Sequence, residues 1–179
     1  MIRTPRLELR HISADDLIVL FESAGQIDIC ADQSFSNPHR VLIDDSGPLR
    51  WRVPQVKENP EVNKWFVRWM VLSETQEVVG STSFHGPPDE NGMMEIGLGV
   101  HPKFHRRGYA TEALRGMWLW VIDQPGVSML RYTVDPLNEE SVGLVKKFGF
   151  DYIGQQIDEI DGPEDIYEMS AVDFRRHFA

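Results

Sequence analysis

The sequence is poor in cysteine, in basic residues and in long apolar runs, and each shortage excludes a class of protein. Cys30 is the only cysteine among 179 residues, so an internal disulfide and a multi-cysteine zinc site are excluded, and we expect no metal. We expect Cys30 to be a small buried residue. The formal net charge of −10 argues against binding to nucleic acid or anionic membranes, because both require a basic face. No apolar run approaches the ~20 residues of a membrane span.

Two common nucleotide-binding motifs are also missing. The sequence contains neither the Gly-x-x-x-x-Gly-Lys-Ser/Thr motif of P-loop proteins nor the Gly-x-Gly-x-x-Gly turn of a Rossmann site. Its first eleven residues alternate charged with apolar side chains and have no apolar core of a signal peptide. We therefore expect a cytoplasmic protein.

The length and the 41% hydrophobic content fit one domain covering residues 1–179. Alternation and turn residues predict a helix–strand mixture with one mostly antiparallel sheet of six or seven strands and helices on both faces. The fold class is thus α+β, or mixed α/β. The strands are expected at residues 6–12, 64–72, 78–84, 93–100, 127–134, 150–157 and 165–170. The helices are expected at residues 13–23, 108–123 and 138–148 and at the C-terminus, with short helices and loops at 24–62.

The stretch from Met94 to Thr111 has the order of an anion site. A strand ends at Val100, and a basic turn of sequence HRRGYA then opens a helix. Helix N-termini carry unpaired N–H groups and a partial positive charge, and glycine lets the backbone approach a ligand closely. This order favours a pyrophosphate site at His105, Arg106, Arg107, Gly108, Tyr109, Ala110 and Thr111. An ordinary strand-to-helix turn is the alternative.

Gly97 and Gly99 stand inside the strand before the turn. Glycine in a strand marks a bulge or a close backbone approach, so the strand is expected to splay from the one at 127–134. A peptide-like ligand such as pantetheine would fit the gap as an extra strand, hydrogen-bonded near Leu98 and Val100. The other explanation is that the glycines make room for Trp118 or Trp120.

Three ordered segments resemble the GNAT superfamily of N-acetyltransferases, in its ribosomal-protein (RimJ/RimL-like) branch. They are the turn with its continuation YATEAL, the segment from Asn138 to Phe150, and the opening TPRLELR followed by Asp15 and Asp16. The turn matches the acetyl-CoA motif Gln/Arg-x-x-Gly-x-Gly/Ala, with His105 in place of the first residue. The resemblance implies a GNAT-like splayed sheet and acetyl-CoA as co-substrate.

The resemblance also assigns roles to single residues. Asn138 is expected to contact pantetheine, although asparagine at a helix start is also a common N-cap. The family's proton-donating tyrosine is replaced by Val145, which leaves Ser141 as a candidate donor or as a capping hydroxyl. Glu95 is expected to act as the base, with a solvent-facing carboxylate as the alternative. In a register shifted by one residue, Met94 would take its place. His85 and His101 are weaker candidates.

The acceptor is expected to be a primary amine, on a protein N-terminus or a cationic small molecule. From Gly149 to Ser170 there is no Lys or Arg but there are seven acids, which would attract a cation or simply be solvated: Asp151, Asp158, Glu159, Asp161, Glu164, Asp165 and Glu168. Residues 24–62 are expected to line the acceptor pocket, with Trp51 as a wall. Two other functions stay open, a non-catalytic acyl-CoA sensor and a different nucleotide binder. Homodimer formation is also open.

Overall fold

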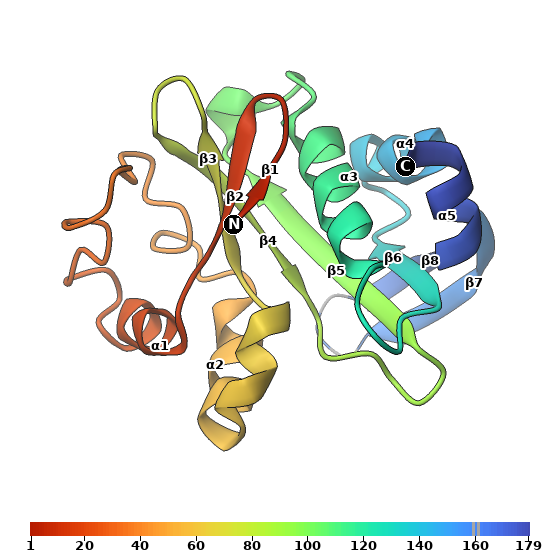
Figure 1. Cartoon of the computed structure of the whole chain (residues 1–179), viewed down its shortest axis with the longest axis horizontal. Coiled ribbons are helices and arrows are strands. Elements are labelled where there is room, and N and C mark those ends of the chain that lie inside the picture. The colour runs from red at the N-terminus through yellow and green to blue at the C-terminus, as the bar shows by residue number, and fades with distance from the viewer. Residues whose placement is uncertain (159, 161) are drawn as a thin grey trace. The chain divides into compact units, whose positions relative to one another are not determined.

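The computed structural model describes residues 1–158, 160 and 162–179. Its strands pair in the order β1-β2-β3-β4-β5-β6-β8-β7, mostly antiparallel, with β5 and β6 parallel (Figure 1). The strands are β1 (Ile2–Arg3), β2 (Leu7–His11), β3 (Arg68–Leu72), β4 (Val78–Phe84), β5 (Met93–Val100), β6 (Met129–Val134), β7 (Asp151–Asp158) and β8 (Gly162–Ser170). The helices are α1 (Ala14–Glu22), α2 (Leu49–Glu58), the 3-10 helices η1 (Pro60–Trp65) and η2 (Pro102–Phe104), α3 (Tyr109–Val121), α4 (Glu139–Lys147) and α5 (Ala171–Phe178). The α+β class is confirmed, with eight described strands instead of six or seven.

The chain forms two compact units, residues 1–85 with 98–117 and residues 86–97 with 118–179. Strand β5 and helix α3 each begin in one unit and end in the other. Among residues 1–158, 160 and 162–179, no helix combines the length and the apolarity needed to cross a membrane.

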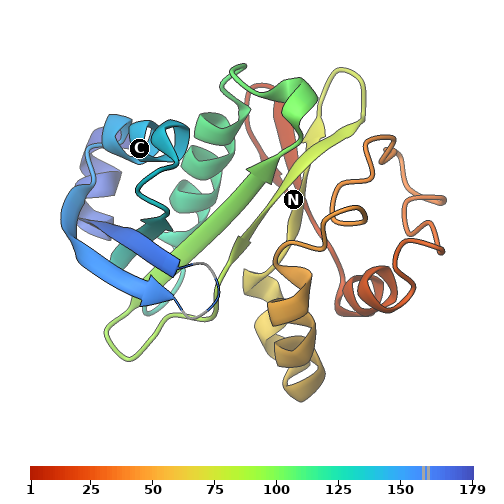
Figure 2. The same ribbon diagram turned by 180° about the vertical axis from the view of Figure 1, so that it is seen from behind.

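The first unit is organised around the antiparallel strands β2, β3 and β4. Leu7 and Leu9 are fully buried and pair with Leu72 and Met70. A Cβ at Gly116 would lie 3.3 Å from Leu9 Cδ1, so the glycine lets α3 pack closely on this face. In the same unit, Ser13 is the N-cap of α1, which matches the helix expected at residues 13–23. A long irregular connection leads from α1 to α2 (Figure 2).

One prediction for this unit needs correction, and one strand of it was missed. The expected strand at 64–72 begins only at Arg68, because the preceding residues form η1. Asn59 caps η1 by accepting a hydrogen bond from the N–H of Glu61, and Pro60 at the first helical position favours the turn. The aromatic residues that resembled a strand therefore belong partly to a helical turn. The two-residue strand β1 was not predicted.

The second unit has an aromatic core on one face of β6, β8 and β7. Trp118 stacks on Phe150 with ring centroids 4.7 Å apart, and it meets Phe148 and Phe174 edge-on. Helices α4 and α5 lie side by side over this core (Figure 1). Because large aromatic side chains bury much apolar area, this cluster fixes α4 and α5 on the sheet.

The ends of α4 agree with the sequence analysis. Asn138 is its N-cap, and Gly149 follows it with φ +75°, the left-handed conformation that glycine adopts without strain. The sequence Asp161-Gly162-Pro163 also predicts a turn between the strands expected at 150–157 and 165–170, and this prediction is tested only in part. Asp161 lies outside the described residues, and Gly162 and Pro163 belong to β8.

Candidate active site

The turn between β5 and α3 contains two residues in the left-handed region. Arg106 has φ +61° and Gly108 has φ +81°. The Nε2 of His105 donates a hydrogen bond of 2.7 Å to the carbonyl of Val100, which ties the turn to the end of β5. A left-handed conformation at a residue with a Cβ is unfavourable, so Arg106 must be held there by its surroundings.

This turn leaves a row of backbone amides available to a ligand. The first hydrogen bond of α3 runs from the N–H of Glu112 to the carbonyl of Gly108, at 3.1 Å. The four preceding amides, at residues 108–111, have no acceptor recorded in the described part of the chain. Together with the positive end of a 13-residue helix, they form an arrangement that binds phosphate groups.

Positive side chains surround the turn within the first unit. The Arg6 guanidinium lies 4.7 Å from the Tyr109 ring centroid, and that of Arg107 lies 5.4 Å from the Phe104 ring centroid. His105, Arg106 and Arg107 are exposed. These charges favour an anion although the whole chain is acidic.

Gly97 and Gly99 follow the part of β5 that pairs with β6. The pairing of β5 with β6 covers three positions, the last between Glu95 and Arg131, and no further pair is registered among the described residues. A Cβ at Gly99 would meet nothing within 4 Å, so Gly99 does not make room for a tryptophan. Gly80 of β4 was missed by the sequence analysis. A Cβ there would lie 2.3 Å from the carbonyl oxygen of Gly99, so close approach of β4 to β5 requires it.

Glu95 lies on the half-buried face of β5, within the second unit. Thr133 of β6 donates a hydrogen bond of 2.6 Å to Glu95 Oε1. Arg131, the register partner of Glu95, forms an ion pair of 2.6 Å with Glu168. Met94 is 1% exposed and belongs to the core, so it has no half-buried side chain of the kind that Glu95 has. Glu95 is therefore a carboxylate held by a hydroxyl donor.

The start of α4 positions Asn138 and Ser141. The Oδ1 of Asn138 accepts a hydrogen bond of 3.1 Å from the N–H of Ser141. The side chain of Ser141 hydrogen-bonds the hydroxyl of Tyr132. Burial raises the pKa of Tyr132, and the bond to Ser141 acts in the opposite direction. Val145 is fully buried in the core, so the family's tyrosine position is a packing position here.

The weaker candidates His101 and His85, and the cysteine, lie outside the groups described so far. His101 stacks on His39 at a centroid distance of 5.0 Å and caps η2 through its Nδ1, while His85 is exposed. Burial, followed by the charges of Lys103 and His101, lowers the pKa of His39. Cys30 is buried, as expected, and burial together with Asp28 and Asp16 raises its pKa to about 11. Such a thiol is a poor nucleophile at neutral pH.

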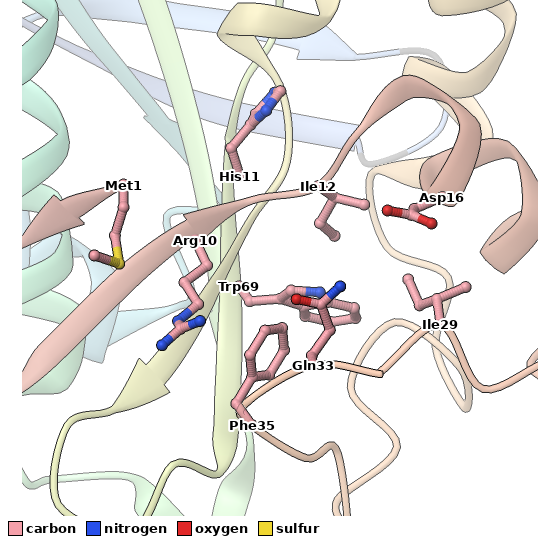
Figure 3. Close-up of a pocket in the computed structure, with 9 residues that line it drawn as sticks. All are labelled: Met1, Arg10, His11, Ile12, Asp16, Ile29, Gln33, Phe35 and Trp69. Atoms are coloured by element: carbon pink, nitrogen blue, oxygen red, sulfur yellow. The ribbon is translucent and has the colours of Figure 1, made fainter. Parts of the chain in front are cut away.

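The segment before α2 lines a cavity of about 260 Å³ in the first unit (Figure 3). Trp69 forms its inner wall, and Arg10, Asp16 and Gln33 supply its polar groups. The Arg10 guanidinium is already bound to Glu8, Ser34 and Gln76. The cavity is smaller than the ~300–1,000 Å³ of ordinary ligand pockets. Trp51 does not line it, so the expected wall at Trp51 has no support from this cavity.

Comparison with known proteins gives the family. Residues 6–151 match the model of the Acetyltransferase (GNAT) domain, so the chain belongs to this family and is an acetyltransferase. It is 35% identical over 88 residues to the uncharacterized N-acetyltransferase YjdG of Bacillus subtilis, covering 49% of this chain and 52% of that protein. The match therefore spans about half the length of that relative.

Solved structures agree in fold. One is RimL, a ribosomal alpha-N-protein acetyltransferase in complex with coenzyme A. It has a TM-score of 0.63 at 14% identity, covering 93% of this chain and 95% of that one. Another is a chimera of the spermidine N-acetyltransferase SpeG from Vibrio cholerae, with a TM-score of 0.64 at 13% identity, covering 94% and 98%. The expected GNAT superfamily is confirmed, and the RimJ/RimL-like branch stays a prediction.

Proposed function

We propose that this acetyltransferase takes its acetyl group from acetyl-CoA and transfers it to a primary amine by direct attack in a ternary complex. The observation that carries the proposal is the turn at residues 105–111. Its two left-handed residues expose four consecutive amides at the positive end of α3. This geometry suits the pyrophosphate of CoA, and RimL, which has the same fold, was solved with coenzyme A.

In this proposal the donor is held mainly by backbone groups. The amides of residues 108–111 bind the pyrophosphate, with His105, Arg106 and Arg107 around them. Leu98 and Val100, beyond the last registered pair of β5, bind the pantetheine amides as an added strand. Asn138 uses its Oδ1 for the helix cap, and its amide nitrogen contacts the pantetheine arm.

The chemistry is assigned to side chains. The amine nitrogen attacks the thioester carbon, and Glu95 takes the amine proton, directly or through one water. The Thr133 hydroxyl keeps the Glu95 carboxylate in place. A backbone N–H between Leu98 and Val100 stabilises the tetrahedral oxyanion. The C–S bond then breaks, and Ser141, bound to Tyr132, donates a hydrogen bond to the departing thiolate. The proton that Glu95 took from the amine passes to solvent, and the thiolate takes up a proton from solvent.

The acceptor class is a primary amine on a protein N-terminus or on a small cation. SpeG is a spermidine N-acetyltransferase and RimL acts on a ribosomal protein, so this fold carries both kinds of acceptor. The acids of the β7–β8 hairpin would attract a cation, although several have partners. Glu168 pairs with Arg131, Asp165 with Gln155, and Glu164 with Gln156.

The proposal is tested by measuring thiol release from acetyl-CoA with a panel of polyamines, aminoglycosides and peptides with free N-termini. Mass spectrometry of the product identifies the acceptor. Release that depends on an amine, with a product heavier than that amine by one acetyl group, supports the proposal. Tight binding of CoA without release for any amine would favour a sensor. Binding of ATP or NAD but not of CoA would contradict the donor assignment.

A further inference from the structure

Arg6 connects the first segment of the chain to the turn, across a separation of about one hundred residues. Its Nη1 donates a hydrogen bond of 2.9 Å to the backbone carbonyl of Arg107. Its Nε donates a hydrogen bond of 2.7 Å to Glu112 Oε2. The guanidinium thus joins the residue before Gly108 to a carboxylate in the first turn of α3.

Glu112 is itself firmly held. Its Oε1 accepts hydrogen bonds of 2.6 Å from the Thr4 hydroxyl and from the backbone N–H of Arg6. Burial alone would raise the pKa of Glu112, but the hydrogen bonds from Thr4 and Arg6 outweigh it and the pKa is lowered. The carboxylate therefore stays charged and fixes the direction of the Arg6 side chain.

The geometry of a trans peptide links this contact to the ligand side of the turn. The peptide between Arg107 and Gly108 is planar, and no cis peptide bond occurs among the described residues. Its carbonyl and its N–H consequently point in opposite directions. When Arg6 binds the carbonyl of Arg107, the N–H of Gly108 is directed away from Arg6, and no protein acceptor is recorded for it in the described sequence.

We propose that Arg6 is a positioning residue for the phosphate-binding turn, and that Thr4 and Glu112 hold Arg6 in place. The inference rests on the proposed function, because it assigns Arg6 a role toward the CoA pyrophosphate. It explains how Arg106 stays in the left-handed region without being glycine. The bond from Arg6 to the next carbonyl limits rotation of the turn.

A direct charge effect makes the opposite prediction for Glu112. If Arg6 acted only as a positive charge near the phosphates, removal of the negative Glu112 would strengthen anion binding. If Arg6 has to be held in position by Glu112, the substitution Glu112→Gln weakens anion binding instead. The amide has one oxygen and one NH₂ group, so it cannot accept from Thr4, the Arg6 N–H and the Arg6 Nε together.

The experiment is calorimetric titration of CoA into wild type, Arg6→Gln, Arg6→Lys and Glu112→Gln, with Arg3→Gln as a control. Arg3 lies in β1, is exposed, and loses the same charge. We expect Arg6→Gln to raise the Kd for CoA by roughly 10- to 100-fold, the effect of one or two charge-assisted hydrogen bonds. Arg6→Lys keeps the charge but loses the planar fork, so it should resemble Arg6→Gln rather than wild type. Arg3→Gln should bind as wild type does.

The kinetic readout separates positioning from a general loss of structure. The Arg6 and Glu112 variants should raise the KM for acetyl-CoA rather than lower kcat, and their unliganded circular dichroism spectra should match wild type. If wild type does not bind CoA, the proposed function and this inference both fail. If wild type binds but Arg6→Lys or Glu112→Gln binds equally well or better, only the positioning role fails. Should Arg6→Gln not fold, the other two variants decide.

Discussion

The turn at residues 105–111 and the Glu95 region use two different kinds of chemistry. At the turn the candidate groups are backbone amides, exposed by positive φ at Arg106 and Gly108. Around Glu95 they are side chains, with Thr133 bonded to the carboxylate and Tyr132 bonded to Ser141. A site made of backbone depends on conformation, whereas a site made of side chains depends on protonation. Substitutions in the first should change binding, and those in the second should change kcat and its pH dependence.

The largest expected effect is that of Gly108→Val. A β-branched residue is strained at φ +81°, so the turn should rearrange and the amides should lose their alignment. A Cβ at Gly108 would meet only Arg6 Nη2, at 3.4 Å, so the fold should survive. We expect the Kd for CoA to rise roughly 100-fold or more, since several charge-assisted hydrogen bonds are lost. Calorimetric titration measures this Kd.

Gly126→Val is the matched control for that variant. Gly126 has φ +83°, nothing within 4 Å of its Cβ position, and lies in the loop before β6. It should carry a similar backbone strain without touching the turn, so CoA affinity should stay at the wild-type value. Equal losses of affinity in both variants would show that strain in general, and not the turn, controls binding.

Glu95→Gln tests the side-chain region. The shape is kept and the charge is removed, so folding and CoA affinity should persist while kcat falls about 10²–10⁴-fold near pH 7. The loss should shrink as the pH approaches the pKa of the acceptor, about 8 for an α-amine and about 10.4 for a lysine-like amine. A pH–rate profile measures both effects. Glu74→Gln, at an exposed position in the turn between β3 and β4, is the control. Full activity of Glu95→Gln at every pH would leave Glu95 as a structural carboxylate.

Ser141→Ala should have a smaller effect on kcat. A thiol with a pKa near 8.5 leaves without much assistance, so we expect a loss below about tenfold. Tyr132→Phe removes the hydroxyl that binds Ser141 and should give a loss of similar size. The two losses should not add in the double variant, because both act through one hydrogen bond. Additive losses, measured as kcat at saturating acetyl-CoA, would separate their roles.

The smallest effect is expected for His105→Gln. The backbone is the binding element here, and glutamine can also donate a hydrogen bond to the Val100 carbonyl in place of His105 Nε2. We expect the Kd for CoA to stay within about threefold of wild type, less than the worth of one ordinary hydrogen bond. A tenfold loss would show that the imidazole itself contacts the ligand.

The two regions also differ in how far the sequence predicted them. The turn was readable because Gly108 and the preceding strand have strong local signals, and β4 and β5 were predicted with their observed bounds. The carboxylate contacts were not readable, since Thr133 reaches Glu95 only through strand pairing. The same holds for Arg6 and Glu112, whose partners are about one hundred residues apart. At residues 64–67 the aromatic pattern predicted a strand, but the Asn59-Pro60 start gives a 3-10 helix.

The most direct test of the account is an ¹⁵N–¹H correlation spectrum recorded during titration with CoA. The account predicts that the amide resonances of residues 108–111 show the largest chemical-shift changes at saturation, because their N–H groups bind the pyrophosphate. The amide resonance of Gly126 should keep its chemical shift. Saturable binding in which the amide resonances of residues 108–111 keep their chemical shifts, while the largest changes occur elsewhere in the chain, would contradict the assignment of the donor site.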